Sequence, residues 1–153
     1  MLDDTTNLRS LLKDPSLLAT QGYLAGDWVD GEDGATFKVL NPARGDVVAN
    51  VADFSRAQTA DAIAKAEIAQ KSWAAHTGKE RANILRRWYD LMMENADDLA
   101  IILTAEQGKP LAEAKGEIGY GASFIEFFAE EAKRIYGETI PGHQPDKRIT
   151  VIK

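Results

Sequence analysis

The sequence has few residues that could take part in catalysis. Its two histidines, His76 and His143, have no serine or carboxylate at a spacing that suggests a catalytic triad or a metal site, and we expect both to be exposed loop residues. Cysteine is absent, which removes disulfides, thiolate metal sites and cysteine nucleophiles. The residues by themselves therefore predict no catalytic constellation.

Glycine motifs give only weak evidence for a nucleotide site. Gly119-Tyr-Gly121 has the first spacing of the dinucleotide-binding fingerprint, in which glycines let the backbone approach a phosphate. However, Phe124 occupies the position of the third glycine, and the motif falls inside an expected helix. Gly78-Lys79 and Gly108-Lys109 lack the upstream glycine of a P-loop. We therefore expect no phosphate site, and we interpret Gly119 and Gly121 as positions of close helix packing.

Length and composition indicate one globular domain with a hydrophobic core. The 153 residues are 44% hydrophobic and 27% charged. The net charge of -6, with basic residues interleaved among acids, argues against nucleic-acid and anionic-membrane partners. We see no signal or transit peptide and no apolar stretch long enough to cross a bilayer, so we expect a cytoplasmic location and no membrane partner.

The first third of the chain is expected to contain a leader and short strands. Residues 1–22 are interpreted as a leader with a short helix around Leu8–Leu12. Residues 23–54 are expected to form a β-hairpin segment, because short apolar runs alternate with turn residues. Its strands begin at Tyr23, Thr36 and Asp46.

Residues 55–147 are expected to form a layer of four helices, because the apolar period changes to about 3.6 after Phe54. Capping boxes at Ser55–Gln58 and Thr77–Glu80 predict the first two helix starts. Gly108 is predicted to end the third helix, and Pro110 to begin a long fourth helix that runs to about residue 136. The tail, residues 148–153, has strong β character.

The long helix has two apolar stripes, whereas an ordinary surface helix has one. The first stripe contains Leu111, Ala114, Ile118, Ile125, Phe128, Ala132 and Ile135. The second contains Tyr120, Phe124 and Phe127. We therefore expect burial on two sides, with the second side covered by a partner chain or by more of the same polypeptide.

Several segments together resemble the aldehyde dehydrogenase family, most closely the bacterial succinate-semialdehyde dehydrogenases. The turn Leu40-Asn-Pro-Ala-Arg-Gly-Asp46 resembles the family's NPATGE turn, and EQGKPLAEA, from Glu106 to Ala114, resembles its E-x-G-K-P helix junction. The segments Arg81–Ala100 and Phe124–Gly142 are similar to the succinate-semialdehyde dehydrogenase forms. The resemblance runs in order from Tyr23 to the end of the chain.

The resemblance implies an α/β fold, of which this chain is the N-terminal part. Short β-hairpins would be followed by a layer of four helices that flanks an incomplete Rossmann-like nucleotide domain. Residues 148–153 would be the truncated first strand of an oligomerisation hairpin. We expect this strand to be unpaired and the protein to be a homo-oligomer, a dimer or a tetramer.

The implied activity is the oxidation of succinate semialdehyde to succinate with NAD or NADP, in 4-aminobutyrate degradation. In that family a cysteine thiolate attacks the aldehyde, hydride passes to the nicotinamide, and a glutamate activates water. The resemblance places these groups beyond Lys153, in the remainder of the same polypeptide, so the isolated chain is expected to be inactive. Two alternatives stay open: another small aldehyde such as glutarate semialdehyde, or a non-catalytic helical interaction module.

Two sets of site residues follow from the resemblance. Tyr120, Phe124 and Phe127 match positions that line the family's aldehyde entrance tunnel, with ordinary core packing as the alternative. Glu106, with the carbonyl groups of Val39 and Leu40, matches a monovalent cation site of some members. The alternative for Glu106 is a carboxylate that is hydrogen-bonded at a helix terminus.

Overall fold

The computed structural model describes residues 4–153, with side chains from residue 8 onward. The first three residues of the predicted leader lie outside the described part. The rest of the leader contains α1 (Asp4–Leu11) and a short 3-10 helix, η1 (Pro15–Leu17), so the expected short helix is present. Among the described residues, no helix combines the length and the apolar character that a membrane crossing requires.

Two β-hairpins occupy the segment where hairpins were predicted. β1 (Gly22–Leu24) pairs with β2 (Asp27–Val29), and the turn between them has positive φ angles at Ala25 (54°) and Gly26 (102°), as a tight two-residue hairpin turn requires. After η2 (Glu32–Gly34), β3 (Thr36–Leu40) pairs with β4 (Val47–Ala52). All these pairings are antiparallel.

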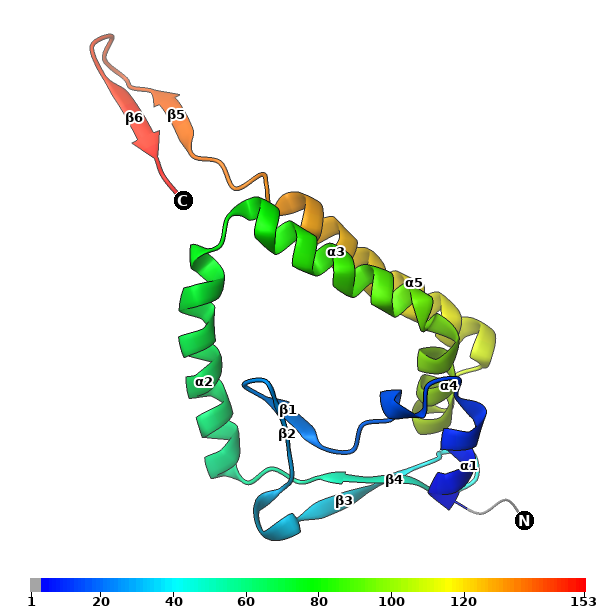
Figure 1. Cartoon of the computed structure of the whole chain (residues 1–153). Coiled ribbons are helices and arrows are strands. Elements are labelled where there is room, and N and C mark those ends of the chain that lie inside the picture. Colours follow the sequence, from blue (N-terminus) through cyan, green and yellow to red (C-terminus); the bar gives the residue numbers. More distant parts are fainter. Residues whose placement is uncertain (1–3) are drawn as a thin grey trace.

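Helix α2 (Arg56–Ala75) begins at the predicted capping box, in which Ser55 and Gln58 cap each other's backbone N–H groups. None of its residues is buried. Figure 1 shows α2 standing apart from the other helices and connecting the hairpins to the helical layer. Most helical stability in proteins comes from the packing of one face, so α2 presents surface that the described residues leave uncovered.

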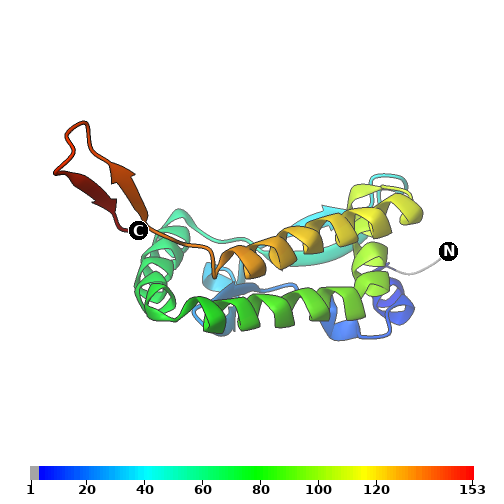
Figure 2. The same ribbon diagram turned by 90° about the horizontal axis from the view of Figure 1, so that it is seen from above.

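The three helices that follow α2 pack together. α3 (Gly78–Glu94) and α5 (Leu111–Glu131) lie side by side, and α4 (Ala96–Gln107) connects them at one end (Figures 1 and 2). The predicted capping box at Thr77–Glu80 is present, and Gly108 ends α4 in the left-handed conformation with φ 81°. The expected ends of the helices are therefore largely confirmed, although α5 stops at Glu131 rather than near residue 136.

Alanines, rather than large side chains, make the closest contacts between these helices. The buried positions are Ala82, Ala100, Ala114, Ala122 and Ala129. Our prediction for the first stripe of the long helix was therefore partly wrong: Leu111 and Phe128 are exposed, because the helix turns its small residues toward α3 and α4. Ile135 lies beyond the end of α5 and is exposed as well. Small side chains let helix backbones approach closely, and the larger residues are then left at the rim.

A small apolar core joins the leader to the hairpins and to α4. Leu8, Leu12, Leu18 and Val48 form its buried centre. The partly buried residues packed against this centre are Val39, Ile101, Ile102 and Ala105. The leader is therefore an integral part of the packed structure.

The end of the chain corrects two predictions. β6 (Arg148–Val151) is not unpaired, because it forms an antiparallel hairpin with β5 (Glu138–Pro141), with Ile140 opposite Ile149. The boundary that we placed between residues 147 and 148 consequently falls inside this hairpin. Pro141 concealed β5 in the sequence, since proline weakens a strand prediction, but β5 is an edge strand of a two-stranded sheet, where proline is tolerated. Figures 1 and 2 show the hairpin as a projecting arm.

Candidate functional site

The aromatic face of α5, formed by Tyr120, Phe124 and Phe127, is exposed. The exposed fractions of these residues are 66%, 47% and 55%. The Tyr120 and Phe124 rings meet edge to face, with centroids 4.8 Å apart. All three residues line one depression in the surface, together with Phe128 and Ser123. The described part of the chain therefore does not bury them as core.

The position of the aromatic face follows from the packing of α5. Its opposite side carries Ala114, Ala122 and Ala129, which are buried against the other helices. Of the two sides that we expected to be buried, the described residues cover only the alanine side, and the covering of the aromatic side stays a prediction. Exposed apolar groups that cluster in this way usually mark a surface that something else contacts.

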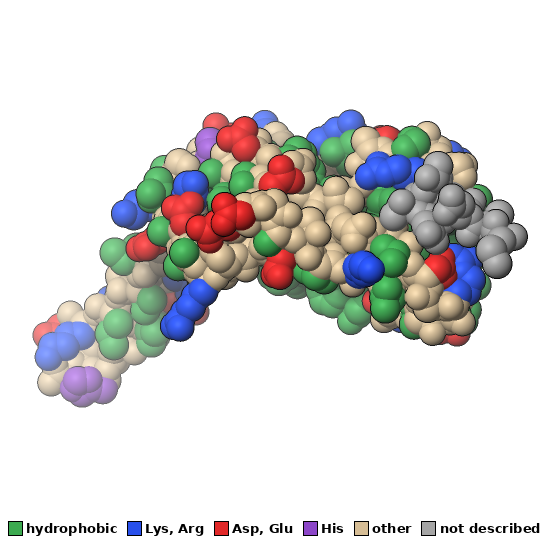
Figure 3. Space-filling model, turned by 90° about the horizontal axis from the view of Figure 1, so that it is seen from below, with side chains coloured by type: hydrophobic (Ala, Val, Ile, Leu, Met, Phe, Trp, Pro, Cys, Tyr) green, Lys and Arg blue, Asp and Glu red, His purple; other side chains and the backbone are tan. Residues whose placement is uncertain are grey.

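A second uncovered apolar face lies on α3 and was not predicted. Ile84, Trp88 and Leu91 are 52%, 55% and 41% exposed, whereas Leu85 and Met92 are partly buried. These five residues share one arc of the helix, and the described residues cover only the part of it that contains Leu85 and Met92. Figure 3 shows the molecule from below, and on this face hydrophobic side chains are dispersed among charged ones.

The candidate cation residues lie at the ends of a helix and a strand that are neighbours in space. Glu106 is in the last turn of α4, and Val39 and Leu40 end β3. A Cβ atom added to Gly108 would lie 2.8 Å from Pro42 Cγ, so the end of α4 touches the turn that follows β3. Within the described chain no three His, Asp or Glu side chains form a metal-binding group. A cation here would therefore depend on one carboxylate and on main-chain carbonyls.

Glu106 does not show the alternative interaction that we considered for it. Its side chain is exposed and has no hydrogen-bond or ion-pair partner among the residues that the structure describes. The carboxylate is therefore free to bind a cation, and this role stays a prediction.

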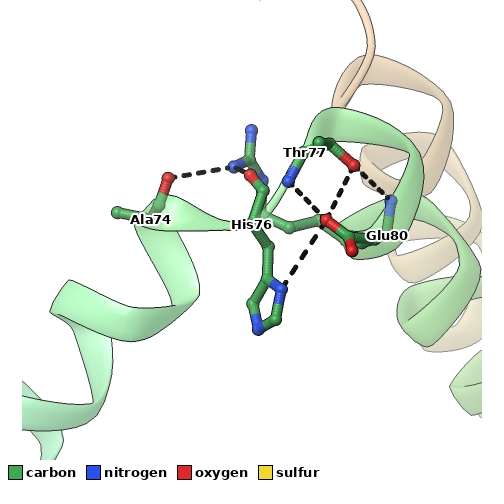
Figure 4. Close-up of polar contacts among 5 residues, drawn as sticks. Ala74, His76, Thr77 and Glu80 are labelled. Carbon is green, nitrogen blue, oxygen red and sulfur yellow. Dashed lines mark hydrogen bonds and ion pairs between the residues drawn. The ribbon is translucent and has the colours of Figure 1, made fainter.

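His76 takes part in a helix junction rather than in a catalytic group. Figure 4 shows it between α2 and α3, with Nδ1 3.7 Å from Glu80 Oε2. The Thr77 N–H donates to the same oxygen over 2.8 Å, and this bond lowers the pKa of Glu80. Glu80 N–H in turn donates to Thr77 Oγ1 over 3.3 Å. His143 lies in the loop of the β5–β6 hairpin, so the prediction that both histidines are exposed loop residues is confirmed.

The glycines of the apparent nucleotide motif lie inside α5, as expected, but our interpretation of their role was wrong. A Cβ atom at Gly119 or Gly121 would meet nothing within 4 Å, so neither glycine permits a close helix contact. The close approach occurs at Gly78, where a Cβ atom would lie 2.5 Å from the Ala132 carbonyl oxygen. Glycine is required there because the start of α3 touches the end of α5.

Truncating the aromatic face should cost little stability. We expect Phe124→Ala and Phe127→Ala each to lower the free energy of unfolding by less than about 1 kcal/mol, well below the ~3–5 kcal/mol of a buried phenylalanine, because the rings are half exposed and alanine favours helix. Urea unfolding followed by circular dichroism would measure this. Ile125→Ala, at a partly buried position of the same helix, is the control and should cost more. If the stability losses at Phe124 and Phe127 were as large as the loss at Ile125, the two rings would have to be buried as core.

Comparison with known proteins gives a family match. The model described as "Aldehyde dehydrogenase family" matches residues 28–153. A glutarate-semialdehyde dehydrogenase of Pseudomonas aeruginosa is 62% identical over 93% of this chain, and a succinate-semialdehyde dehydrogenase [NADP(+)] of Escherichia coli is 56% identical over 93%. The match takes in 29% and 30% of the length of these two relatives.

A solved structure agrees with the sequence comparison. An aldehyde dehydrogenase from Brucella melitensis biovar abortus superposes with a TM-score of 0.88 at 58% identity. It is matched over 92% of this chain and 29% of its own chain. The observed arrangement of hairpins and helices is thus part of a larger known fold.

Proposed function

Because this chain belongs to the aldehyde dehydrogenase family, we propose that it forms one segment of an NAD(P)-dependent dehydrogenase that oxidises succinate or glutarate semialdehyde to the dicarboxylate. The observation that carries this proposal is the identity of 62% and 56% to relatives with these two activities. The E. coli relative is named for NADP, which supports a nicotinamide cofactor. Degradation of 4-aminobutyrate is the corresponding route for succinate semialdehyde.

We propose glutarate semialdehyde and succinate semialdehyde as equal candidate substrates, although the sequence resemblance favoured succinate semialdehyde. The two substrates differ by one methylene, and one methylene in an apolar pocket is worth about a 10- to 200-fold difference in kcat/KM. Discrimination therefore depends on the depth of the pocket that holds the carbon chain.

The 153 residues supply no thiol, so the nucleophile of this chemistry would have to come from outside them. A bound nicotinamide would supply the hydride acceptor for this oxidation. We propose that the aromatic face contributes to the aldehyde entrance: Tyr120, Phe124 and Phe127 would pack against the substrate's carbon chain and exclude water. Their exposure, and the fact that they line one depression, support this role.

We propose a cytoplasmic homo-oligomer in which the β5–β6 arm contacts another subunit, because the arm projects from the body and carries the exposed Ile149. The Glu106 carboxylate with the carbonyls of Val39 and Leu40 would hold a monovalent cation, which would tie the end of α4 to β3. The non-catalytic interaction module is the alternative if the activity test fails.

A segment exchange tests the proposed function. The matching segment of the P. aeruginosa glutarate-semialdehyde dehydrogenase is replaced by this chain, and reduced nicotinamide is followed by its near-UV absorbance with each semialdehyde. We expect the chimera to keep kcat/KM within about tenfold of the host. In the chimera, Tyr120→Ala should raise KM for the aldehyde and leave KM for the cofactor almost unchanged.

Two controls accompany the exchange. The 153-residue chain alone should give no turnover with either cofactor, because it has no cysteine. Turnover by the pure chain would refute the proposal that the catalytic nucleophile comes from outside these 153 residues. A folded, cofactor-binding chimera without activity would argue for the interaction module.

A further inference from the structure

A second cavity, remote from the aromatic face, has the composition of a small-molecule site. Its volume is about 410 Å³, within the usual range for ligand pockets. It lies between α1, the β3–β4 turn, the second half of α4 and the start of α5. Leu8, Val48, Ile101 and Leu111 give it apolar walls, and the cation candidates Glu106, Val39 and Leu40 are not part of its lining.

Asn41 presents a fixed hydrogen-bond donor to this cavity. The residue is buried, with an exposed fraction of 9%, and it lines the cavity. Its Oδ1 accepts the backbone N–H groups of Ala43 over 2.9 Å and Arg44 over 3.2 Å. These two bonds fix the orientation of the side-chain amide, and its NH₂ group remains to donate to a ligand.

Thr104 supplies an unsatisfied polar group at the same place. Its Oγ1 is shielded from solvent and has no hydrogen-bond partner within the described residues, although Thr104 itself lines the cavity. A buried hydroxyl without a partner is destabilising. A rotation about χ1 would carry the hydroxyl to the position that the methyl group now occupies, and from there an acceptor in the cavity would give this hydroxyl the bond that it lacks.

The charges at the cavity cancel each other. Arg44 donates from Nε to Asp46 Oδ1 over 2.8 Å and from Nη2 to Oδ2 over 2.7 Å, and both residues line the cavity. This hydrogen bond lowers the pKa of Asp46, which therefore stays ionised at neutral pH and matches the charge of Arg44. The pair has no net charge, and burying an unpaired charge is costly, so the cavity favours an uncharged ligand.

We propose that this cavity binds a small uncharged amphipathic molecule, whose carbonyl oxygen accepts hydrogen bonds from Asn41 and Thr104 and whose short alkyl chain packs against the leucine and valine walls. This site is independent of the proposed dehydrogenase activity, because it shares no residue with the aromatic face or with the cation candidates.

Titration of the ¹⁵N-labelled 153-residue chain tests the proposal. The probe is hexanamide, and the comparison compounds are hexanoate, which carries a charge, and acetamide, which lacks the alkyl chain. We expect hexanamide to shift the amide signals of residues around the cavity and to bind at least about fivefold more tightly than either comparison compound, the order of one hydrogen bond or of a few buried methylenes.

Three variants localise the binding. Thr104→Val removes the unpaired hydroxyl at nearly constant shape, so it should raise the urea midpoint and weaken hexanamide binding about fivefold. Thr59→Val is the matched control, because Thr59 is exposed on α2 and its hydroxyl donates to the Ser55 carbonyl; it should leave binding unchanged. Ala43→Phe places a ring at the exposed turn that lines the cavity and should abolish binding without unfolding the chain.

The opposite effects of Thr104→Val on stability and on binding are diagnostic of the proposed site. Absence of binding by hexanamide, or binding that Ala43→Phe leaves intact, would overturn the proposal. Equal binding of hexanoate would overturn the assignment of an uncharged ligand, and binding unaffected by Thr104→Val would overturn the role of the hydroxyl.

Discussion

Replacing Asp98 with alanine is expected to lower the free energy of unfolding by about 3 kcal/mol, because two hydrogen bonds to a buried charged acceptor are lost. Asp98 is 2% exposed and lies in the first turn of α4. Its Oδ1 accepts the backbone N–H of Lys13 over 3.0 Å, and its Oδ2 accepts that of Asp14 over 2.8 Å. This carboxylate therefore ties the leader to the helical layer across more than 80 residues of sequence.

The neighbouring Asp97 provides a matched control for this prediction. Asp97 is exposed and pairs with Lys13 and Lys115 on the surface, where ion pairs contribute little. Asp97→Ala should therefore cost much less than Asp98→Ala, and Asp98→Asn, which keeps one acceptor oxygen, should be intermediate. Urea unfolding gives the three free energies, and hydrogen exchange at Lys13 and Asp14 should accelerate only in the Asp98 variants. Equal losses for Asp97→Ala and Asp98→Ala would contradict the assignment.

Replacing Ala122 with leucine is expected to destabilise the helical layer by about 2–3 kcal/mol, because the extra carbon atoms have no space. Ala122 has an exposed fraction of 0% and lies on the side of α5 that packs against the other helices. Relieving the overlap would require α5 to move away from its neighbours, which would also disturb the contacts of Ala114 and Ala129.

Ala112→Leu is the control for Ala122→Leu, because Ala112 is exposed on the same helix. This substitution should change stability only slightly, since alanine and leucine have similar helix propensities. The midpoint of urea unfolding, followed by far-ultraviolet circular dichroism, compares the two variants. An Ala122→Leu variant as stable as Ala112→Leu would show that the alanine side of α5 is not closely packed.

Local sequence signals determined most of the element boundaries. The capping boxes at Ser55–Gln58 and Thr77–Glu80 and the left-handed Gly108 each act within four or five residues, so they could be recognised without any knowledge of tertiary contacts. The same is true of the hairpin that joins β3 and β4. The two-sided apolar character of α5 was also visible in the residue pattern, and this pattern identified the aromatic face.

Only the tertiary structure decided which side of each helix is covered and which segments meet. The sequence pattern could not show that alanines would form the buried side of α5 while Phe128 stays exposed, because that choice depends on how closely α3 and α4 approach. Asp98, the β5–β6 pairing and the cavity beside Asn41 and Thr104 were missed for the same reason. The first and the third join residues that are distant in the sequence, and a proline hid the second. A single sequence carries no signal for contacts that arise only when separate elements pack together.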